Sequence, residues 1–246
     1  MTFNPIVSVA GVSHAYEHVP VLHDVSVSVN EGERVLILGA NGAGKSTLAM
    51  VMAGLVHPQS GSVRLFGEPI DGLPAYRIAR LGLSYTPAYR SVFPYMTVEE
   101  NLHLGSEVLA RFREGEAGEV SERQLDLVYR LFPQLADLRK TRAGTLSGGV
   151  QRMVEIGRSL MGAPQVLILD EPSLGLAQGV INELVSALRV LADHGITLIM
   201  IEQNVPVAAV VCDRGYLMDG GRIALAATAA ELLDSDQVKR TYLGVI

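Results

Sequence analysis

Three short apolar runs in the chain are each followed directly by glycine-rich or charged residues. The runs span residues 35–38, 166–169 and 197–201. Apolar runs without alternation are typical of parallel strands that are buried on both faces. Because ligands bind at the carboxyl ends of the strands in open parallel sheets, we expect the polar residues after the three runs to face one site.

Helical patterns lie between these runs. One extends over residues 45–53, and another extends over residues 179–194 and stops at Gly195. In the second pattern apolar residues recur on one helix face, at Val180, Leu184, Leu188 and Leu191. The alternation of strands and helices predicts an α/β fold.

The N-terminal third has a different pattern. Residues 25–29 alternate valine and serine, as in an antiparallel strand with one face exposed to solvent. Residues 6–10 and 63–66 are its expected partners. The sequence therefore predicts an antiparallel β subdomain beside the main sheet.

Residues 96–162 are predicted to be mostly helical. The segments Thr-Val-Glu-Glu at 97–100 and Ser-Glu-Arg-Gln at 121–124 both fit the capping box that begins a helix. Residues 111–123 are rich in charges and are interpreted as an exposed loop. A late helix is expected to begin at residues 228–231, where Thr-Ala-Ala-Glu is a third capping box.

Composition limits the classes of function. The chain has 246 residues, of which 48% are hydrophobic, and this is enough for a large core in one or two domains. The net charge of -6 argues against nonspecific nucleic-acid binding, which needs a basic face. Cys212 is the only cysteine, so an internal disulfide is impossible and a reducing compartment is favoured. We find neither a signal-peptide pattern nor a membrane-spanning segment.

A phosphate-binding P-loop follows the first apolar run. Residues 39–47 read Gly-Ala-Asn-Gly-Ala-Gly-Lys-Ser-Thr and fit GxxxxGK[ST]. The backbone N–H groups of such a loop surround an anion, and the helix that follows adds its positive dipole end. The alternative is a glycine-rich turn before an ordinary helix. The residues expected to bind the nucleotide are Gly39, Asn41, Gly42, Ala43, Gly44, Lys45, Ser46 and Thr47.

Two acidic residues follow the second run without a gap. Phosphoryl transfer to water needs a metal anchor and a group that orients the water. Asp170 suits the Mg²⁺ shell together with the Ser46 hydroxyl, and Glu171 suits the general base. Lys45 would reach the terminal phosphates of ATP. The alternative for the acidic pair is a strand that ends in solvated carboxylates.

The segment Leu-Ser-Gly-Gly at residues 146–149 precedes an expected helix at 150–161. Two glycines and a serine at a helix start make a second candidate anion site. The alternative is a plain glycine turn in which Ser147 caps the helix.

Together these residues resemble the ATP-binding subunit of an ABC transporter over essentially the whole chain. The resemblance implies one nucleotide-binding domain, 1–246, built on a P-loop NTPase core with a mainly parallel sheet. Residues 1–90 and 163–246 would form this core with its β subdomain, and residues 91–162 would form an inserted helical subdomain.

The resemblance also implies roles for further residues. In this family two subunits enclose two ATP molecules head to tail, so Ser147, Gly148 and Gly149 would contact the nucleotide of the partner. Gln203 would be the switch residue, and Tyr16 would stack on adenine. The alternative for Tyr16 is a packing residue at a strand end.

Several segments are similar to the ATPases of branched-chain amino-acid importers. They are residues 84–87, 92–94, 97–102, 171–177 and 202–204. Gln203 stands where most of the superfamily has its switch histidine. Ala177 stands where the family usually has an aspartate, in the segment called the D-loop. Both replacements are typical of the branched-chain group. Ala88 departs from the family's pattern, because a glutamine or glutamate normally follows the proline at position 87. That side chain contacts the region near the metal.

This narrower resemblance implies partners and a location. The partners would be two transmembrane permease subunits, a second identical or non-identical ATPase subunit and, indirectly, a solute-binding protein. The chain would be cytoplasmic and peripheral on the inner face of the cell membrane. Branched-chain amino acids are the expected solute, and urea, amides or other amino acids are the alternatives.

Aromatic residues gather in one proline-containing loop, at Tyr85, Tyr89, Phe93 and Tyr95. This favours a recognition surface, and in the family the region meets a cytoplasmic helix of the membrane subunit. The alternative is that these rings fill the joint between the subdomains.

Two other classes of function remain open. A soluble ABC ATPase of DNA repair or translation usually has a coiled-coil insertion or two fused ATPase domains, and this chain has neither. Another P-loop enzyme, such as a small-molecule kinase, would give no role to residues 146–149 or to Gln203.

Overall fold

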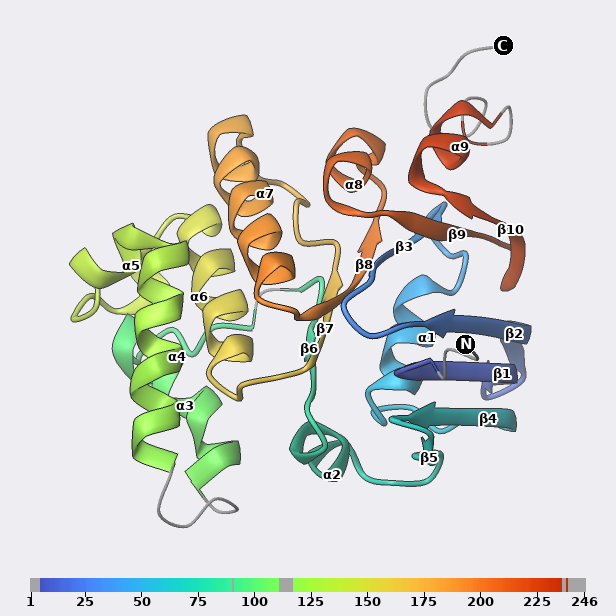
Figure 1. Ribbon diagram of the computed structural model, residues 1–246, viewed down its shortest axis with the longest axis horizontal. Coiled ribbons are helices and arrows are strands. Elements are labelled where there is room, and N and C mark those ends of the chain that lie inside the picture. The colour runs from blue at the N-terminus through green and yellow to red at the C-terminus, as the bar shows by residue number, and fades with distance from the viewer. Residues whose placement is uncertain (1–4, 90, 111–116, 236–237, 239–246) are drawn as a thin grey trace.

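Two β-sheets of different type form the centre of the fold (Figure 1). The computed structural model describes residues 5–89, 91–110, 117–235 and 238. The antiparallel sheet has the order β2-β1-β4-β5, with β1 (Val7–Tyr16), β2 (Val19–Val29), β4 (Ser60–Leu65) and β5 (Glu68–Pro69). The other sheet has the order β10-β9-β3-β8-β7-β6, with β3 (Arg34–Gly39), β6 (Leu83–Thr86), β7 (Val166–Asp170), β8 (Thr197–Glu202), β9 (Arg214–Asp219) and β10 (Arg222–Thr228).

The antiparallel sheet confirms the prediction made from alternating residues. Val7 pairs with Val29 of β2 on one side and with Leu65 of β4 on the other. The valines of residues 25–29 are buried and the serines between them are exposed. One face of this sheet therefore packs on the core.

The three apolar runs form β3, β7 and β8, which pair in parallel as predicted. Alternate residues of each strand enter different hydrophobic clusters. In β3, Leu36 and Leu38 pack with the cluster that contains α7, whereas Val35 and Ile37 pack with the cluster that contains α1 and the antiparallel sheet. Both faces of the sheet are thus covered, which explains why the runs lack polar residues.

The helices lie on two sides of the strands β6 and β7. In Figure 1, α3, α4, α5 and α6 lie together on one side of β6 and β7, and α1 lies on the other side, beside the antiparallel sheet. The division into a core and an inserted helical subdomain at residues 91–162 stays a prediction. The helices are α1 (Lys45–Met52), α2 (Ala75–Arg80), α3 (Val98–Ala110), α4 (Ala117–Leu131), α5 (Pro133–Asp137), α6 (Gly148–Leu160), α7 (Gln178–Asp193), α8 (Val205–Val211) and α9 (Ala229–Asp234).

Two of the three predicted capping boxes are present. The Thr97 N–H donates to Glu100 Oε2 at 2.7 Å and the Glu100 N–H donates to Thr97 Oγ1 at 3.2 Å. Thr228 and Glu231 make the same reciprocal pair at the start of α9.

The third capping box and part of the predicted loop are wrong. Helix α4 begins at Ala117, so Ser121 lies inside it, and residues 117–123 are helical. The physical reason is the buried Val120, which lies seven and eight residues before the buried Leu127 and Val128 and therefore on the same helix face. Residues 111–116 of the predicted loop lie outside the described residues.

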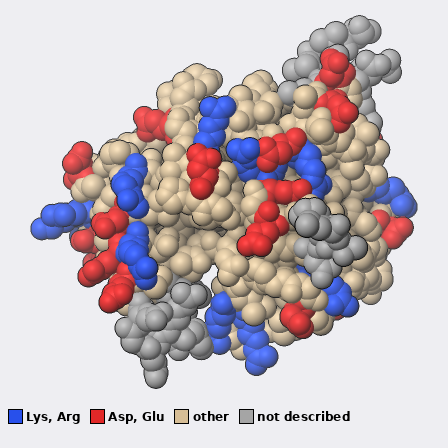
Figure 2. Space-filling model, viewed as in Figure 1, with Lys and Arg blue, Asp and Glu red and all other residues tan. Residues whose placement is uncertain are grey.

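Charged side chains are mixed over the visible surface. Figure 2 shows lysine and arginine interspersed with aspartate and glutamate on this face. Among the described helices, none is both long enough and apolar enough to cross a membrane.

Candidate active site

The P-loop connects the end of β3 to the start of α1, as predicted. Gly44 caps α1 with a φ of 95°, a left-handed conformation that glycine adopts without strain. A Cβ at Gly44 would lie 2.9 Å from Val21 O, and a Cβ at Gly39 would lie 2.6 Å from Met218 O. The loop is therefore held closely between β2 and β9, and both positions require glycine.

Lys45 is buried inside this loop. Its Nζ donates to Gly39 O at 2.7 Å and to Ala40 O at 3.0 Å. Burial lowers the pKa of Lys45, and the nearby Glu171 and Asp170 carboxylates oppose this shift. The predicted phosphate-binding cation thus lies beside the predicted acidic pair.

Asp170 ends β7 and is only 1% exposed. Its Oδ2 accepts a hydrogen bond from the Tyr85 hydroxyl at 3.0 Å. Burial raises the pKa of this carboxyl, while hydrogen bonding from Ser46 and Tyr85 lowers it. Ser46 is thus near, yet the buried Oδ1 has no hydrogen bond of normal geometry to any described residue. An unpartnered carboxylate oxygen beside a hydroxyl fits Mg²⁺, which prefers oxygen ligands.

Glu171, Gln203 and Asn41 meet at the same edge. Gln203 Nε2 donates to Glu171 Oε1 and, at 2.6 Å, to Asn41 Oδ1. Glu171 has a φ of 46°, which is unusual for a residue with a side chain, and its N–H donates to Ile201 O of β8 at 2.8 Å. The predicted base is therefore held in a fixed place between the predicted switch residue and the neighbouring strand.

Tyr16 lies at the end of the hairpin that β1 and β2 form. It ends β1, pairs with Val19 of β2, and is 42% exposed. The His14 ring packs edge-on against it, with centroids 4.8 Å apart. Adenine stacking by Tyr16 stays a prediction.

Ser147, Gly148 and Gly149 of the Leu-Ser-Gly-Gly segment lie at the start of α6, apart from the P-loop of the same chain. Ser147 caps α6, and its Oγ accepts from the Val150 N–H at 3.4 Å. Figure 1 shows α6 and α1 on opposite sides of β6 and β7. The helix-capping alternative is therefore realised, and contact of Ser147, Gly148 and Gly149 with a partner's nucleotide stays a prediction.

Arg152 is a site residue that the sequence reasoning missed. Its Nη1 donates to Pro87 O and its Nη2 donates to Asp170 O, both at 2.6 Å. Nη1 also pairs with Glu155 Oε2 at 3.1 Å. Arg152 therefore ties α6 to the ends of β6 and β7, and the buried Arg-x-x-Glu pair in α6 is the signal that could have indicated it.

Glu202 is a second missed residue. Its buried carboxylate accepts from the Ser173 N–H at 2.9 Å and from the Gln203 and Asn204 N–H groups at 3.1 Å each. Burial raises the pKa of Glu202, and these hydrogen bonds oppose the shift. Glu202 thus joins the segment after Glu171 to the segment that holds Gln203.

The aromatic loop is mostly exposed. Tyr89 and Tyr95 are 73% and 88% exposed and Phe93 is half-exposed, which favours a recognition surface over a filled joint for these three. Tyr85 differs because it is partly buried and bonded to Asp170.

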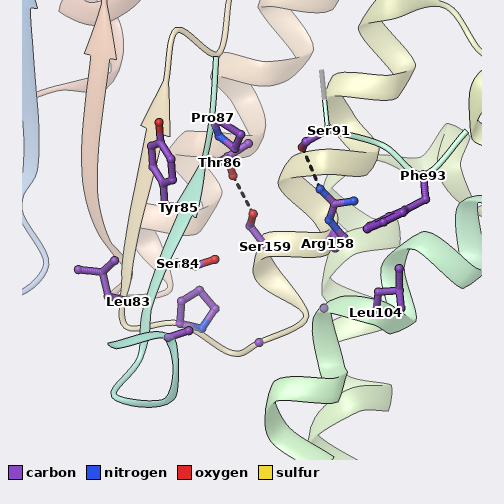
Figure 3. Close-up of a pocket in the computed structure, with 14 residues that line it drawn as sticks. Leu83, Ser84, Tyr85, Thr86, Pro87, Ser91, Phe93, Leu104, Arg158 and Ser159 are labelled. Atoms are coloured by element: carbon purple, nitrogen blue, oxygen red, sulfur yellow. Dashed lines mark hydrogen bonds between the residues drawn. The ribbon is translucent and has the colours of Figure 1, made fainter. Parts of the chain in front are cut away.

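A groove of about 490 Å³ lies beside this loop (Figure 3). It is lined by residues of β6, α3, α6 and the loop between β6 and α3, among them Tyr85, Phe93, Leu104 and Arg158. The Arg158 guanidinium packs over the Phe93 ring at 5.2 Å, and its Nη2 donates to Ser91 Oγ at 2.9 Å. Its Nη1 is buried and has no hydrogen-bond partner among the described residues. One wall of the groove therefore contains the positive charge of a guanidinium group.

A family model described as ABC transporter matches residues 22–174, which is more than half of the chain. The chain belongs to the ABC transporter family. The predicted resemblance and fold class are thus confirmed, and the chain is an ABC ATPase that binds and hydrolyses ATP.

Relatives of known name match almost the whole chain. It is 44% identical over 233 residues to the high-affinity branched-chain amino acid transport ATP-binding protein BraG of Pseudomonas aeruginosa, covering 95% of this chain and 97% of BraG. It is 37% identical over 230 residues to the lipopolysaccharide export system ATP-binding protein LptB of Acidithiobacillus ferridurans, covering 94% and 93%. It is 34% identical over 232 residues to the probable branched-chain amino acid transport ATP-binding protein LivF of Archaeoglobus fulgidus, covering 94% and 95%.

Solved structures agree with the family assignment. A nucleotide-free ATP-binding cassette from an ABC transporter matches with a TM-score of 0.84 and 28% identity, covering 98% of this chain and all of the other. A cassette in its ADP conformation matches with a TM-score of 0.84 and 29% identity over the same shares.

We expect Arg152→Met to lower the free energy of unfolding by about 3–5 kcal/mol, because the buried Glu155 loses its charged partner. Urea denaturation measures this change, and adding Glu155→Gln to the variant should recover part of it. A loss below about 1 kcal/mol would show that the pair contributes no more than an exposed ion pair.

Proposed function

We propose that this chain is the ATP-hydrolysing subunit that powers import of branched-chain amino acids through two membrane permease subunits. The observation that supports the chemistry most is that Lys45, Asp170, Glu171 and Gln203 meet at one edge of the parallel sheet. The observation that supports the solute is the 44% identity to BraG over nearly the full length of both chains.

The P-loop residues surround the phosphates of ATP, and Lys45 provides their cationic partner. Ser46 and Asp170 would hold Mg²⁺, which would neutralise charge on the phosphate oxygens. Glu171 accepts a proton from the attacking water, and Gln203, already bonded to Glu171, orients that water. Tyr16 stacks on adenine from the edge of the antiparallel sheet.

A second ATPase subunit, identical or not, completes each site. Ser147, Gly148 and Gly149 lie at the start of α6 and contact the nucleotide that the partner binds. The Ser147 oxygen accepts from the Val150 N–H, so its hydroxyl hydrogen is still able to donate to a phosphate.

The groove beside the aromatic loop receives a cytoplasmic helix of one permease subunit. Exposed aromatic rings and arginine are enriched at protein interfaces, and the Arg158 guanidinium lines this groove. The chain is then peripheral on the cytoplasmic face of the membrane. A solute-binding protein acts on the outer side and meets this chain only through the permeases.

Export of lipopolysaccharide is the second candidate, because LptB relatives match with 37% identity. The higher identity to BraG favours import. Urea, amides and other amino acids remain alternative solutes, since the residues of the ATPase do not contact the solute.

We expect Glu171→Gln to slow hydrolysis by about 10²–10⁴, the contribution of a general base, and to leave ATP affinity unchanged. An ATP-bound dimer should accumulate, because the dimer opens after hydrolysis. Steady-state hydrolysis and size-exclusion chromatography measure the two effects, with the exposed Glu31→Gln as the control. A wild-type rate in Glu171→Gln would remove the role given to Glu171.

We also expect a strain that lacks this chain to lose high-affinity uptake of leucine, isoleucine and valine. Radiolabelled uptake measures the loss, and the wild-type chain, but not Glu171→Gln, should restore it. Undiminished uptake of these amino acids with lost uptake of urea, or a lipopolysaccharide export defect, would contradict the proposed solute and leave the ATPase chemistry in place.

A further inference from the structure

Tyr85 makes the side-chain hydrogen bond to the carboxylate of Asp170. It lies in β6 opposite Ile168 of β7, two residues before Asp170. Its ring packs against the hydrophobic cluster that contains α1, and in Figure 3 it lies on the other side of the strand from Ser159, Arg158 and Phe93. The Tyr85 hydroxyl donates to Asp170 Oδ2 at 3.0 Å. Its hydroxyl therefore reaches the edge of the sheet that holds Asp170 from the face that packs on α1.

The hydrogen bond distinguishes the two oxygens of Asp170. Oδ2 accepts from Tyr85, whereas Oδ1 is buried and has no hydrogen-bond partner of normal geometry among the described residues, and Ser46 lies near the same carboxylate. The last torsion of an aspartate side chain is soft, so the two oxygens exchange easily when neither is fixed. A donor on Oδ2 restricts this torsion and leaves Oδ1 to bind a ligand.

The hydroxyl of Tyr85 is a permanent donor at neutral pH. Burial, together with the adjacent Asp170 carboxylate, raises the pKa of Tyr85 well above its ordinary value. The phenol therefore keeps its proton, and a neutral donor to a carboxylate makes a charge-assisted hydrogen bond. Arg152 also binds Asp170, but at the main-chain oxygen, and so it does not fix the side-chain torsion.

We infer that Tyr85 is a positioning residue for the metal: its hydroxyl holds the Asp170 carboxylate in the orientation in which Oδ1 and Ser46 bind Mg²⁺ with the nucleotide. This inference rests on the proposed function, in which Asp170 and Ser46 are the metal ligands. It gives Tyr85 a role apart from the exposed aromatic residues Tyr89, Phe93 and Tyr95 of the loop that follows β6.

The test measures metal binding without hydrolysis. The full chain is loaded with a fluorescent, non-hydrolysable ATP analogue in EDTA, and Mg²⁺ is then added in steps. In Tyr85→Phe, which removes only the hydroxyl, the affinity for the metal-free analogue should stay within about twofold and the Mg²⁺ concentration at half-saturation should rise about tenfold, the effect of losing a hydrogen bond to a charged group.

A matched control makes the same chemical change elsewhere. Tyr129 lies in α4, and its hydroxyl is buried without a partner among the described residues. Tyr129→Phe should leave the half-saturating Mg²⁺ concentration unchanged. Tyr85→Met keeps an apolar side chain without the hydroxyl and should reproduce the shift seen in Tyr85→Phe, so the result does not depend on one variant folding well.

A double-mutant cycle separates positioning from general packing. If Tyr85 acts through Asp170, Tyr85→Phe should add nothing to the weaker Mg²⁺ binding of Asp170→Asn. Unchanged Mg²⁺ binding in Tyr85→Phe, or a full additional shift in the Asp170→Asn background, would overturn the inference while the proposed function stands. A wild-type chain whose analogue binding does not depend on Mg²⁺ would overturn both.

Discussion

The parallel pairing of β3, β8 and β7 is the constraint on which the site depends. Leu38 pairs with Glu202 and Asp170 pairs with Ile201, so the three strands end at the same level of the sheet. Their alternate residues enter two different hydrophobic clusters, one with α1 and one with α7. A shift of one residue would exchange these two sets of side chains and would move Asp170 away from Ser46. Core packing therefore fixes the geometry of the polar edge.

Charge at this edge is buried and only partly balanced. Lys45, Asp170 and Glu202 are all buried, and burial moves the pKa of Lys45 down and those of the two carboxyls up. Glu202 satisfies its carboxylate with three main-chain donors, whereas Asp170 keeps one oxygen unpartnered. This difference separates a structural carboxylate from one that is suited to a ligand. A divalent cation at Asp170 would supply the positive charge that the single lysine does not.

The elements that could be predicted from the sequence are those that depend on the local pattern of residues. The three buried strands, the helix after the P-loop and the capping boxes at Thr97 and Thr228 follow from periodicity and from short-range hydrogen bonding. The start of α4 was wrong because the burial of Val120 depends on packing against the rest of the fold, which outweighed the local capping signal at Ser121. The contacts of Arg152 and Tyr85 span 65 and 85 residues of sequence, and local pattern does not encode them.

We propose above all that this edge of the sheet binds ATP through Lys45. The most direct measurement is the affinity of the purified chain for ATP, by fluorescence or calorimetry, in the wild type and in Lys45→Ala. We predict that the Lys45→Ala variant loses measurable affinity for ATP, because the phosphates lose the cation that the P-loop provides. Its unfolding transition should stay cooperative. A folded Lys45→Ala variant with wild-type ATP affinity would contradict this proposal.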